Sequence, residues 1–395
     1  MKIAEINMTA EGSTGGIMFG IAECARKRGH QVRTYSFKTF TRGKRGNYPK
    51  REGHAYLGSE QGAMIHFLLG YTFGSNGRHS SFATRKLIRQ LRVWKPDVLH
   101  LHNLHKFCIN LPMLFQYIKK NKVRVVWTFH DCFPFTGKCP HFTMAECDKW
   151  KNVCSNCPQL SGYPKSRRDT TKKMWNLKKK WFTGVEDMTI VTPSNWLAGL
   201  VKESFLKDYP VRVIPNGIDI SIFQPQEQKP LEKYLVLGVA DGWGKRKGLD
   251  VFEELSEMLP EDYRILLVGI GESQKEGFLG KIQTVGKTRD RQSLAKLYAM
   301  ADVFVNPTRE DNFPTVNMEA LACGTPVVTF RTGGAAEMLS ESCGAVVDCG
   351  DVHSLKQEII RICMEKPYSV EDCRRQAEKF DEGVRFQEYV DLFES

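Results

Sequence analysis

"DVFVNPTREDNFPTVNMEALACGTPVVTF", residues 302–330, is the stretch of this sequence that decides the fold. It begins with an apolar run of strand type, continues through an acidic loop and a helix opened by Pro314, and ends in a second apolar run after Cys323-Gly324. A strand, a helix and a second strand in this order form the unit that joins two parallel strands. The stretch therefore predicts an α/β fold with parallel sheets.

The same alternation of short β-branched runs and longer amphipathic segments occurs in two series along the chain. The first series runs from Lys2 to His130. Its expected helices cover 16–29, 82–94 and 110–120. The second series runs from Lys233 to Asp348. Its expected helices cover 248–258, 291–300, 315–323 and 333–340. Because 395 residues exceed the usual size of one hydrophobic core, we expect two α/β domains.

The boundary between the domains is expected in the polar segment "NGIDISIFQPQEQKPLEK", which carries two prolines and no periodic apolar face. We place the first domain at 1–217, the linker at 218–232 and the second domain at 233–368. The last segment, 369–395, has a helical period. It either completes the second domain or, as we expect, packs back toward the first.

Composition and charge narrow the class of protein. The chain is 41% apolar and 26% charged, as in ordinary globular proteins. It shows neither a signal peptide nor a long uninterrupted apolar run, so we expect a cytoplasmic protein. A formal charge of +12 indicates an anionic partner, such as a nucleotide, a nucleic acid or a membrane surface. A nucleic-acid-binding protein with a zinc module would explain the charge but not the two α/β series, so no nucleic-acid partner is expected.

Ligands of parallel sheets bind beyond the carboxyl ends of the strands. After the first strand, Gly15 and Gly16 would let backbone N–H groups approach a phosphate or a sugar; the alternative is a tight turn that binds nothing. In the second half, Arg246 and Lys247 precede a helix and could meet a diphosphate, unless they form only a solvated basic turn. Neither GxGxxG nor GxxxxGK[ST] occurs, so a dinucleotide oxidoreductase and a P-loop NTPase are not supported.

The helix opened by Pro314 has the features of a nucleotide-sugar site. Its first turn leaves the N–H groups of Thr315 and Val316 available to an anion or a hydroxyl group. Glu319, about one turn later, carries two acceptor oxygens that match a ribose diol. The acidic residues at 310–311 lie on the preceding loop, within reach of a sugar attached to that nucleotide.

The segment "EDNFPTVNMEALACGTPVVTFRTGG" resembles the donor-site signature of retaining glycosyltransferases of family 4, also called group 1. The motifs "TFHD", "VTPSNWL", "VIPNGID", "KRKG" and "GIGE" follow the family's order, so the resemblance spans nearly the whole chain. It implies an α/β fold of GT-B architecture, in which two Rossmann-like domains with parallel sheets face a central cleft. Residues 1–217 would then bind the acceptor, and residues 233–368 the nucleotide sugar.

The resemblance also implies roles for single residues. Asp311 occupies the first acidic position of the family's E-x7-E element and would face the donor sugar, and Glu319 occupies the second and would hold the ribose. Lys247 would neutralise the diphosphate, with Arg246 beside it, and His130 would lie near the transferred sugar. Further donor contacts are expected from Gly15, Gly16, Asn312, Phe313, Pro314, Thr315 and Val316.

Two positions depart from the family pattern. Asp311 replaces the usual Glu and has Glu310 beside it, so both acids remain candidates for the catalytic position. Asp241 stands where an arginine is expected, about six residues before Lys247, so Arg246 or Lys245 would take over part of the diphosphate contact.

The function implied is a glycosyltransferase of the hexosyltransferase type (EC 2.4). Attack on the same face as the leaving phosphate would retain the anomeric configuration, and preorganised cations and helix N–H groups would stabilise the leaving diphosphate. No cofactor is required for catalysis. We expect a UDP-sugar donor, then a GDP-sugar, and a glycan or lipid-linked oligosaccharide acceptor in cell-surface polysaccharide biosynthesis. The alternatives are a nucleotide-sugar epimerase of similar architecture and a non-catalytic regulator that binds sugar nucleotides.

Four cysteines form a separate pattern in the segment 132–165, which we interpret as an insertion. They are Cys139, Cys147, Cys154 and Cys157, and their spacing is C-x7-C-x6-C-x2-C. The last pair has the spacing of metal ligands, so the four thiolates could bind a structural zinc. The alternative is a set of buried free thiols. A metal held by four thiolates has no open position for catalysis.

The segment 166–184, "SRRDTTKKMWNLKKKWFTG", interleaves basic and apolar residues. As a helix it could lie peripherally on the anionic inner face of the cell membrane. The alternative is a helix packed in the core with a solvated basic face. Its tentative acceptor or membrane contacts are Arg167, Arg168, Lys172 and Lys173. His102, in "HLHNLH", could line the acceptor cleft or be merely structural.

Overall fold

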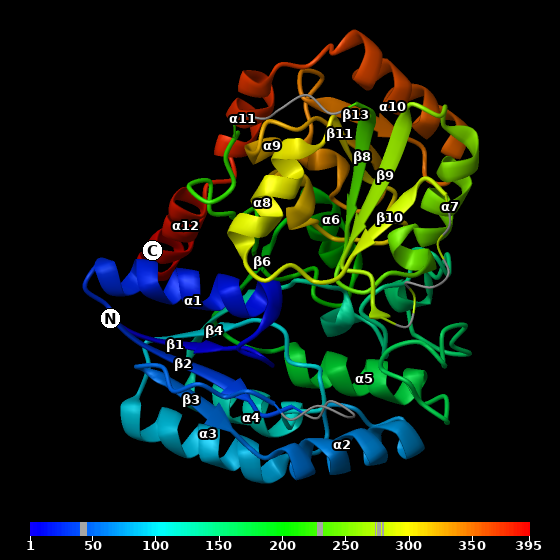
Figure 1. Cartoon of the computed structure of the whole chain (residues 1–395). Coiled ribbons are helices and arrows are strands. Elements are labelled where there is room, and N and C mark those ends of the chain that lie inside the picture. The colour runs from blue at the N-terminus through cyan, green and yellow to red at the C-terminus, as the bar shows by residue number, and fades with distance from the viewer. Residues whose placement is uncertain (40–45, 227–231, 273, 275–277, 279) are drawn as a thin grey trace. The chain divides into compact units, whose positions relative to one another are not determined.

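The computed structural model describes residues 1–39, 46–226, 232–272, 274, 278 and 280–395. The chain divides into two compact units (Figure 1). Unit 1 comprises residues 1–214 and 386–395, and unit 2 comprises residues 215–385. Each unit is built on its own parallel β-sheet, so the expected α/β fold with parallel sheets is confirmed.

Unit 1 contains a seven-stranded sheet in the order β3-β2-β1-β4-β5-β6-β7, and every pairing is parallel. Its strands are β1 (Lys2–Ile6), β2 (Gln31–Phe37), β3 (His54–Leu57), β4 (Val98–Leu101), β5 (Arg124–Thr128), β6 (Met188–Thr192) and β7 (Val211–Val213). Both faces of the sheet are covered, so nearly all residues of the central strands β1, β4, β5 and β6 are buried.

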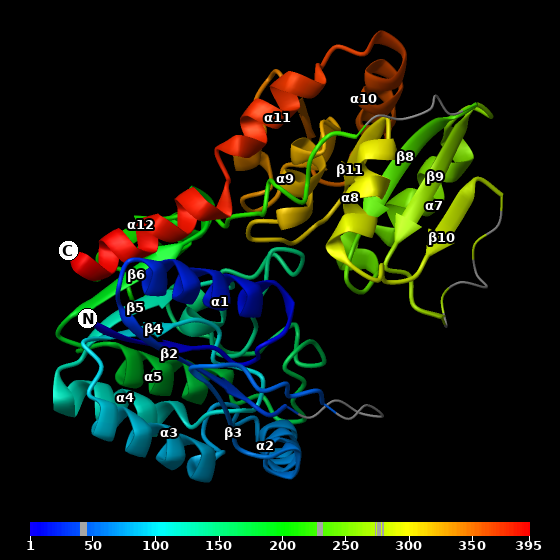
Figure 2. The same cartoon turned by 60° about the vertical axis from the view of Figure 1, so that its left-hand side comes forward.

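Two separate cores cover the two faces of this sheet. Figure 2 shows α1 and α12 over one face and α3, α4 and α5 over the other. The helices of unit 1 are α1 (Gly12–Lys27), α2 (Glu60–Phe73), α3 (Ser81–Trp94), α4 (Leu111–Asn121), α5 (Thr171–Phe182) and α6 (Asn195–Glu203), with short 3₁₀ helices η1 (Phe133–Phe135) and η2 (Lys149–Lys151). Among the described residues no helix is long and apolar enough to cross a membrane.

Unit 2 contains a six-stranded parallel sheet in the order β10-β9-β8-β11-β12-β13. Its strands are β8 (Tyr234–Val239), β9 (Tyr263–Val268), β10 (Ile282–Val285), β11 (Val303–Asn306), β12 (Val327–Phe330) and β13 (Gly344–Val347). Its helices are η3 (Lys245–Lys247), α7 (Leu249–Met258), α8 (Arg291–Met300), α9 (Thr315–Ala322), η5 (Ala336–Met338), α10 (Val352–Glu365) and α11 (Val370–Glu378).

The chain end agrees only in part with the expected return to the first domain. Residues 369–395 form two helices, of which α11 packs against α9 in unit 2. The second helix, α12 (Glu382–Glu394), belongs to unit 1 from Phe386 onward. There Phe386 packs directly on Gly20, where a Cβ would lie 2.1 Å from its ring. A side chain at position 20 would therefore displace α12.

Three other expectations need correction. The expected linker 218–232 contains Ile218 and Phe223, which are buried in the core of unit 2, and its residues 227–231 lie outside the described residues. The expected helix at 333–340 is only the 3₁₀ turn η5. The elements β3, α2, β6, α6, β7, β10 and α10 were not expected at all.

Both sheets reverse their strand order beside the first strand of the unit. In unit 1, Ile3 of β1 pairs with Val32 of β2 on one side and Val98 of β4 on the other. In unit 2, β8 lies between β9 and β11 in the same way. Open α/β sheets bind ligands at such switch points, beyond the carboxyl ends of the strands.

Candidate active site

The loop after β8 and the loop after β11 are joined into one structure in unit 2. The backbone oxygen of Arg246 accepts hydrogen bonds from the Arg309 N–H at 2.9 Å and from the Thr308 hydroxyl at 3.2 Å. The Arg246 guanidinium donates in turn to the backbone oxygen of Glu310 at 3.0 Å. The expected diphosphate-binding turn is therefore held against the acidic loop of the expected sugar site.

Two glycines allow this close approach. Gly248 has φ +75°, and a Cβ there would lie 2.3 Å from the Pro307 oxygen. Gly333 has φ +51°, and a Cβ there would lie 1.7 Å from the Asp311 oxygen. Because both positions are left-handed and crowded by backbone, only glycine fits them without movement of the loops.

Lys247 and Asp311 form an ion pair between these two loops. Their side chains are 17% and 20% exposed, so the pair is accessible from solvent but not freely solvated. Glu310, in contrast, is only 4% exposed. Of the two candidate acids, Asp311 is therefore the one that lies beside the expected phosphate-binding cation.

The helix α9 begins directly after this loop, with Pro314 as its N-cap. Thr315 and Val316 occupy its first turn, where backbone N–H groups have no partner within the helix, and both residues are partly exposed. Asn306, at the end of β11, donates to the Asn317 side chain at 2.7 Å and fixes this turn on the sheet. The positive end of α9 thus lies next to the loop that carries Asp311.

Glu319 lies one turn further along α9. Its Oε2 accepts a hydrogen bond from the Tyr298 hydroxyl at 3.0 Å. Burial raises the pKa of Glu319, and the hydrogen bond from Tyr298 opposes that rise. Tyr298 is fully buried on α8 and was missed in the sequence, because it belongs to another helix and no motif marks it. It orients the carboxylate that we expect to hold a ribose.

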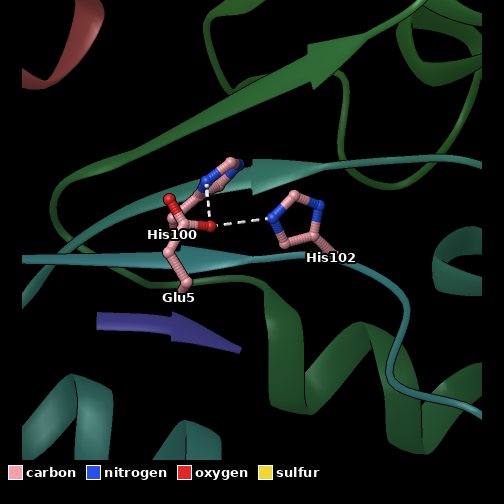
Figure 3. Close-up of side chains that lie close together, drawn as sticks. All are labelled: Glu5, His100 and His102. Atoms are coloured by element: carbon pink, nitrogen blue, oxygen red, sulfur yellow. Dashed lines mark hydrogen bonds and ion pairs between the residues drawn. The ribbon is translucent and has the colours of Figure 1, made fainter. Parts of the chain in front are cut away.

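Four side chains form a connected polar group at the switch point of unit 1. His130 follows β5, and its Nε2 lies 3.0 Å from His102 Nδ1. His102 Nε2 contacts Glu5 Oε2 at 2.9 Å, and His100 Nδ1 lies 2.8 Å from the same oxygen (Figure 3). Glu5, His100 and His102 are completely buried. Ligands of one zinc ion at about 2 Å would stand about 3.3 Å apart, so these distances fit hydrogen bonds better than a metal site.

Burial determines the protonation of this group. It lowers the pKa of His102 to about 3 and that of His130 to about 4, so both imidazoles are neutral near pH 7. A neutral His102 that donates from Nε2 to Glu5 has a lone pair on Nδ1, which accepts the Nε2 proton of His130. Glu5 and His102 thereby set the tautomer and the orientation of His130. The expectation that His102 lines the acceptor cleft is wrong, because its side chain has no exposed surface.

A second chain of polar contacts holds the loop after His130. Asp131 contacts His105 Nε2 at 2.8 Å and accepts a hydrogen bond from the Phe133 N–H at 2.9 Å. Burial would raise the pKa of Asp131, but the neighbouring His105 holds it below its usual value. Tyr163 lies 2.9 Å from the other nitrogen of His105. This chain ties the insertion to the residue next to His130.

The glycine pair of unit 1 lies inside α1, which begins at Gly12 rather than at the expected residue 16. A Cβ on Gly15 would lie 2.5 Å from the Ala10 oxygen, so Gly15 is required for the turn before the helix to pack. Gly16 is exposed. Of the two glycines, only Gly16 presents an open surface to a ligand.

The four cysteines of the insertion are free thiols. Cys154 is buried and accepts a hydrogen bond from the Gly137 N–H at 3.1 Å, and burial raises the pKa of Cys139 to about 12. No three sulfurs of these four described cysteines lie within 4.8 Å of one another. Among the described residues, that closeness of three potential ligand atoms occurs at Glu5, His100 and His102. Zinc binding by Cys139, Cys147, Cys154 and Cys157 remains a prediction.

The basic helix α5 packs its apolar side into the core of unit 1. Met174, Trp175 and Phe182 are buried there. Lys178 is buried with them and donates to the backbone oxygen of Phe133 at 2.6 Å. The four expected acceptor or membrane contacts, Arg167, Arg168, Lys172 and Lys173, are exposed, as are Lys179 and Lys180. The interpretation of α5 as a helix with its apolar face in a membrane is wrong, because that face is already covered.

Comparisons with known proteins agree with this architecture. A family model described as Glycosyltransferase Family 4 matches residues 17–222, and one described as Glycosyl transferases group 1 matches residues 233–365. The putative colanic acid biosynthesis glycosyl transferase WcaC of Escherichia coli (strain K12) is 27% identical over 379 residues, which cover 90% of each chain.

Two solved structures share the whole fold. Sucrose-phosphate synthase from Thermosynechococcus elongatus matches with a TM-score of 0.71 and 18% identity, over 100% of this chain and 98% of that one. Anabaena Alr3699/HepE in complex with UDP-glucose matches with a TM-score of 0.65 and 15% identity, over 100% and 99%.

Two Rossmann-like units with parallel sheets define a glycosyltransferase of GT-B architecture. The chain belongs to glycosyltransferase family 4, and it is related to enzymes named for polysaccharide biosynthesis. The expected family, enzyme class and fold are therefore confirmed.

Proposed function

We propose that this enzyme transfers a hexosyl group, with retention of configuration, from a nucleotide sugar to a glycan or lipid-linked oligosaccharide of a cell-surface polysaccharide. The observation that carries the proposal is the contact of Lys247 with Asp311 beside the first turn of α9. This arrangement gathers a cation, helix N–H groups and a carboxylate for the sugar in one place. A UDP-sugar is the favoured donor, since HepE has been solved with UDP-glucose, and a GDP-sugar is the next candidate.

Each group has a role in the proposed reaction. Lys247, Arg246 and the N–H groups at the start of α9 bind the diphosphate and stabilise the charge that it gains on leaving. Glu319 accepts hydrogen bonds from the ribose hydroxyls, and Asp311 accepts them from the donor sugar. His130 binds the sugar that is transferred. Lys247, Arg246 and the N–H groups of α9 would neutralise the diphosphate, so the reaction needs no metal ion for this role.

The bonds broken and formed in the proposed reaction balance without a nucleophile from the protein. The bond between the anomeric carbon and the diphosphate oxygen breaks, and its electron pair stays with the diphosphate. An acceptor hydroxyl forms the new bond on the same face of the sugar, and its proton passes to the departing phosphate oxygen. The products are the lengthened glycan and a nucleoside diphosphate.

The experiment that tests this function follows nucleotide release from UDP-, GDP- and ADP-sugars, with and without lipid-linked acceptors. We expect acceptor-dependent release that is lost in Glu319→Ala and kept in Glu365→Ala, an exposed carboxylate on α10. A change of the sugar without any acceptor would show an epimerase instead. Nucleotide-sugar binding without turnover would show a regulator.

A further inference from the structure

A cavity of about 640 Å³ opens in unit 1 between α2, α3 and the end of β3. None of the residues assigned above to donor binding or to His130 lines it. Its wall includes Leu69 of α2 and Phe107, and the apolar side chains at its mouth are Ile65 and Phe82. Such a volume is large enough for a ligand of drug size or for part of a lipid chain.

The mouth of this cavity is strongly apolar. Phe82 is 86% exposed and Ile65 is 54% exposed, although both are large hydrophobic residues. Met64, Leu68 and Phe73 of α2 are also exposed apolar residues. Large exposed apolar side chains beside a cavity often mark a binding site for a protein, a membrane or an apolar ligand.

The charged groups of the cavity are all cationic. Lys38, Arg78 and Lys86 line it, and among the described residues no Asp or Glu does. Burial lowers the pKa of His66 in its wall to about 3, so this histidine adds no charge near pH 7. An anion is therefore the complementary polar group for the cavity.

The basic segment before α5 flanks the same helix. The guanidinium of Arg168 lies 5.7 Å from the ring of Phe73, and that of Arg167 lies 5.8 Å from the ring of Tyr71. The Arg167 N–H also donates to the Tyr71 backbone oxygen at 2.8 Å. Basic groups thus border the apolar surface of α2 beyond the cavity itself, as in sites that bind an amphiphile with an anionic head.

We propose that this cavity binds the lipid phosphate of the acceptor, that is, a phosphate ester on a long apolar chain. The chain lies against Ile65, Leu69 and Phe82, and the phosphate is bound by Lys38 and Lys86 together with Arg78. The proposal rests on the proposed function, because it assigns the acceptor of that reaction to the lipid-linked class. It places lipid recognition on α2 and α3 instead of α5.

Calorimetric titration with dodecyl phosphate below its critical micelle concentration tests the site directly. We expect saturable binding that is about tenfold tighter than that of inorganic phosphate or of dodecyl maltoside, because only dodecyl phosphate satisfies both the cations and the apolar wall. Phe82→Ala and Lys86→Ala should each weaken it about tenfold. Val93→Ala is the matched control, since Val93 is 80% exposed on the same helix and does not line the cavity.

Equal affinities of the wild type and Phe82→Ala, or equal binding of dodecyl maltoside, would overturn the proposal. In the enzyme, Phe82→Ala should raise KM for the lipid-linked acceptor about tenfold and leave KM for the nucleotide sugar unchanged. An equal rise for the same glycan without its lipid would also contradict it. If the protein binds dodecyl phosphate but no nucleotide sugar, the proposed function fails while the lipid site stands.

Discussion

The ammonium group of Lys247 contacts the carboxylate of Asp311 in unit 2, so the expected phosphate-binding cation is paired with the expected sugar-binding acid. A diphosphate that binds Lys247 must therefore share it with Asp311. When the diphosphate leaves, Asp311 is the acid that regains Lys247 as its partner. Glu310, the neighbouring acid, is buried.

Asp311→Asn should separate nucleotide binding from catalysis. Removal of the carboxylate leaves Lys247 entirely to the diphosphate, so Kd for UDP should stay equal or become slightly tighter. Turnover should fall by about 100-fold, because a preorganised charge beside the sugar is lost. Titration with UDP and steady-state rates measure the two effects. Glu310→Gln is the matched variant, and a larger loss of turnover in it than in Asp311→Asn would show that the assignment of the acid is wrong.

Tyr298→Phe should weaken donor binding through Glu319. Loss of one hydrogen bond to a carboxylate costs about 1.5 kcal/mol, which is roughly tenfold in Kd. The effect should vanish with 2′-deoxy-UDP if Glu319 binds the ribose 2′-hydroxyl. Tyr263→Phe, which removes another buried hydroxyl of unit 2, is the control. Equal losses for UDP and its deoxy analogue would contradict the role of Tyr298.

Glu5→Gln should lower kcat and leave KM for the donor unchanged. The amide no longer requires a proton on His102 Nε2, so the tautomer of His130 is no longer set. A change in the pH dependence of kcat distinguishes this effect from simple loss of stability. The matched variant is Glu23→Gln, an exposed carboxylate of α1. If Glu5→Gln keeps the wild-type kcat and pH profile, Glu5 does not position His130.

Unit 1 should lose stability before unit 2 in mild acid. Burial lowers the pKa of His66, His100 and His102 to about 3 and that of His54 to about 4. Below the unfolded pKa of about 6.5 the unfolded chain binds more protons, so the folded state is destabilised as the pH falls toward 4. Burial also raises the pKa of Glu5, and this single group acts in the opposite direction.

Each of these histidines should cost on the order of 1 kcal/mol per pH unit in that window. Urea unfolding at pH 7.5 and 5.5, followed by hydrogen exchange, measures the change in each unit. The internal control is unit 2, whose one histidine, His353, is exposed. A parallel loss of protection in both units at pH 5.5 would contradict this explanation.

The zinc prediction can be tested by metal analysis of the purified protein. If the four cysteines bind a structural ion, one zinc per chain is expected, and Cys157→Ser should release it and unfold the insertion. Cys349→Ser, which changes an exposed cysteine of unit 2, should retain it. Absence of zinc in protein purified without chelators would leave the four residues as ordinary thiols.

Much of the fold follows from local sequence patterns. The runs at β5, β8 and β11 contain several consecutive apolar residues, which is typical of strands covered on both faces. Among the missed elements, β3 has only four residues and α2 carries apolar side chains around most of its circumference. The helix α10 has an ordinary amphipathic pattern and was still not among the expected helices. The expected helix at 333–340 fails because the backbone there is tied to the loop at 309–312, where Gly334 donates to the Asn312 oxygen at 3.1 Å.

By itself, the sequence determined the local order of groups in the donor site. The spacing of Asp311, Pro314 and Glu319 lies within one loop and one helix, where backbone geometry alone brings the residues near one another. The tertiary structure decided which distant residues support them. Glu5 contacts His102, which is 97 positions away in the sequence, because β1 pairs with β4. The apolar face of α5 packs into the core of unit 1. Burial and pairing of this kind depend on the neighbours that the sheet provides, and the local sequence does not specify those neighbours.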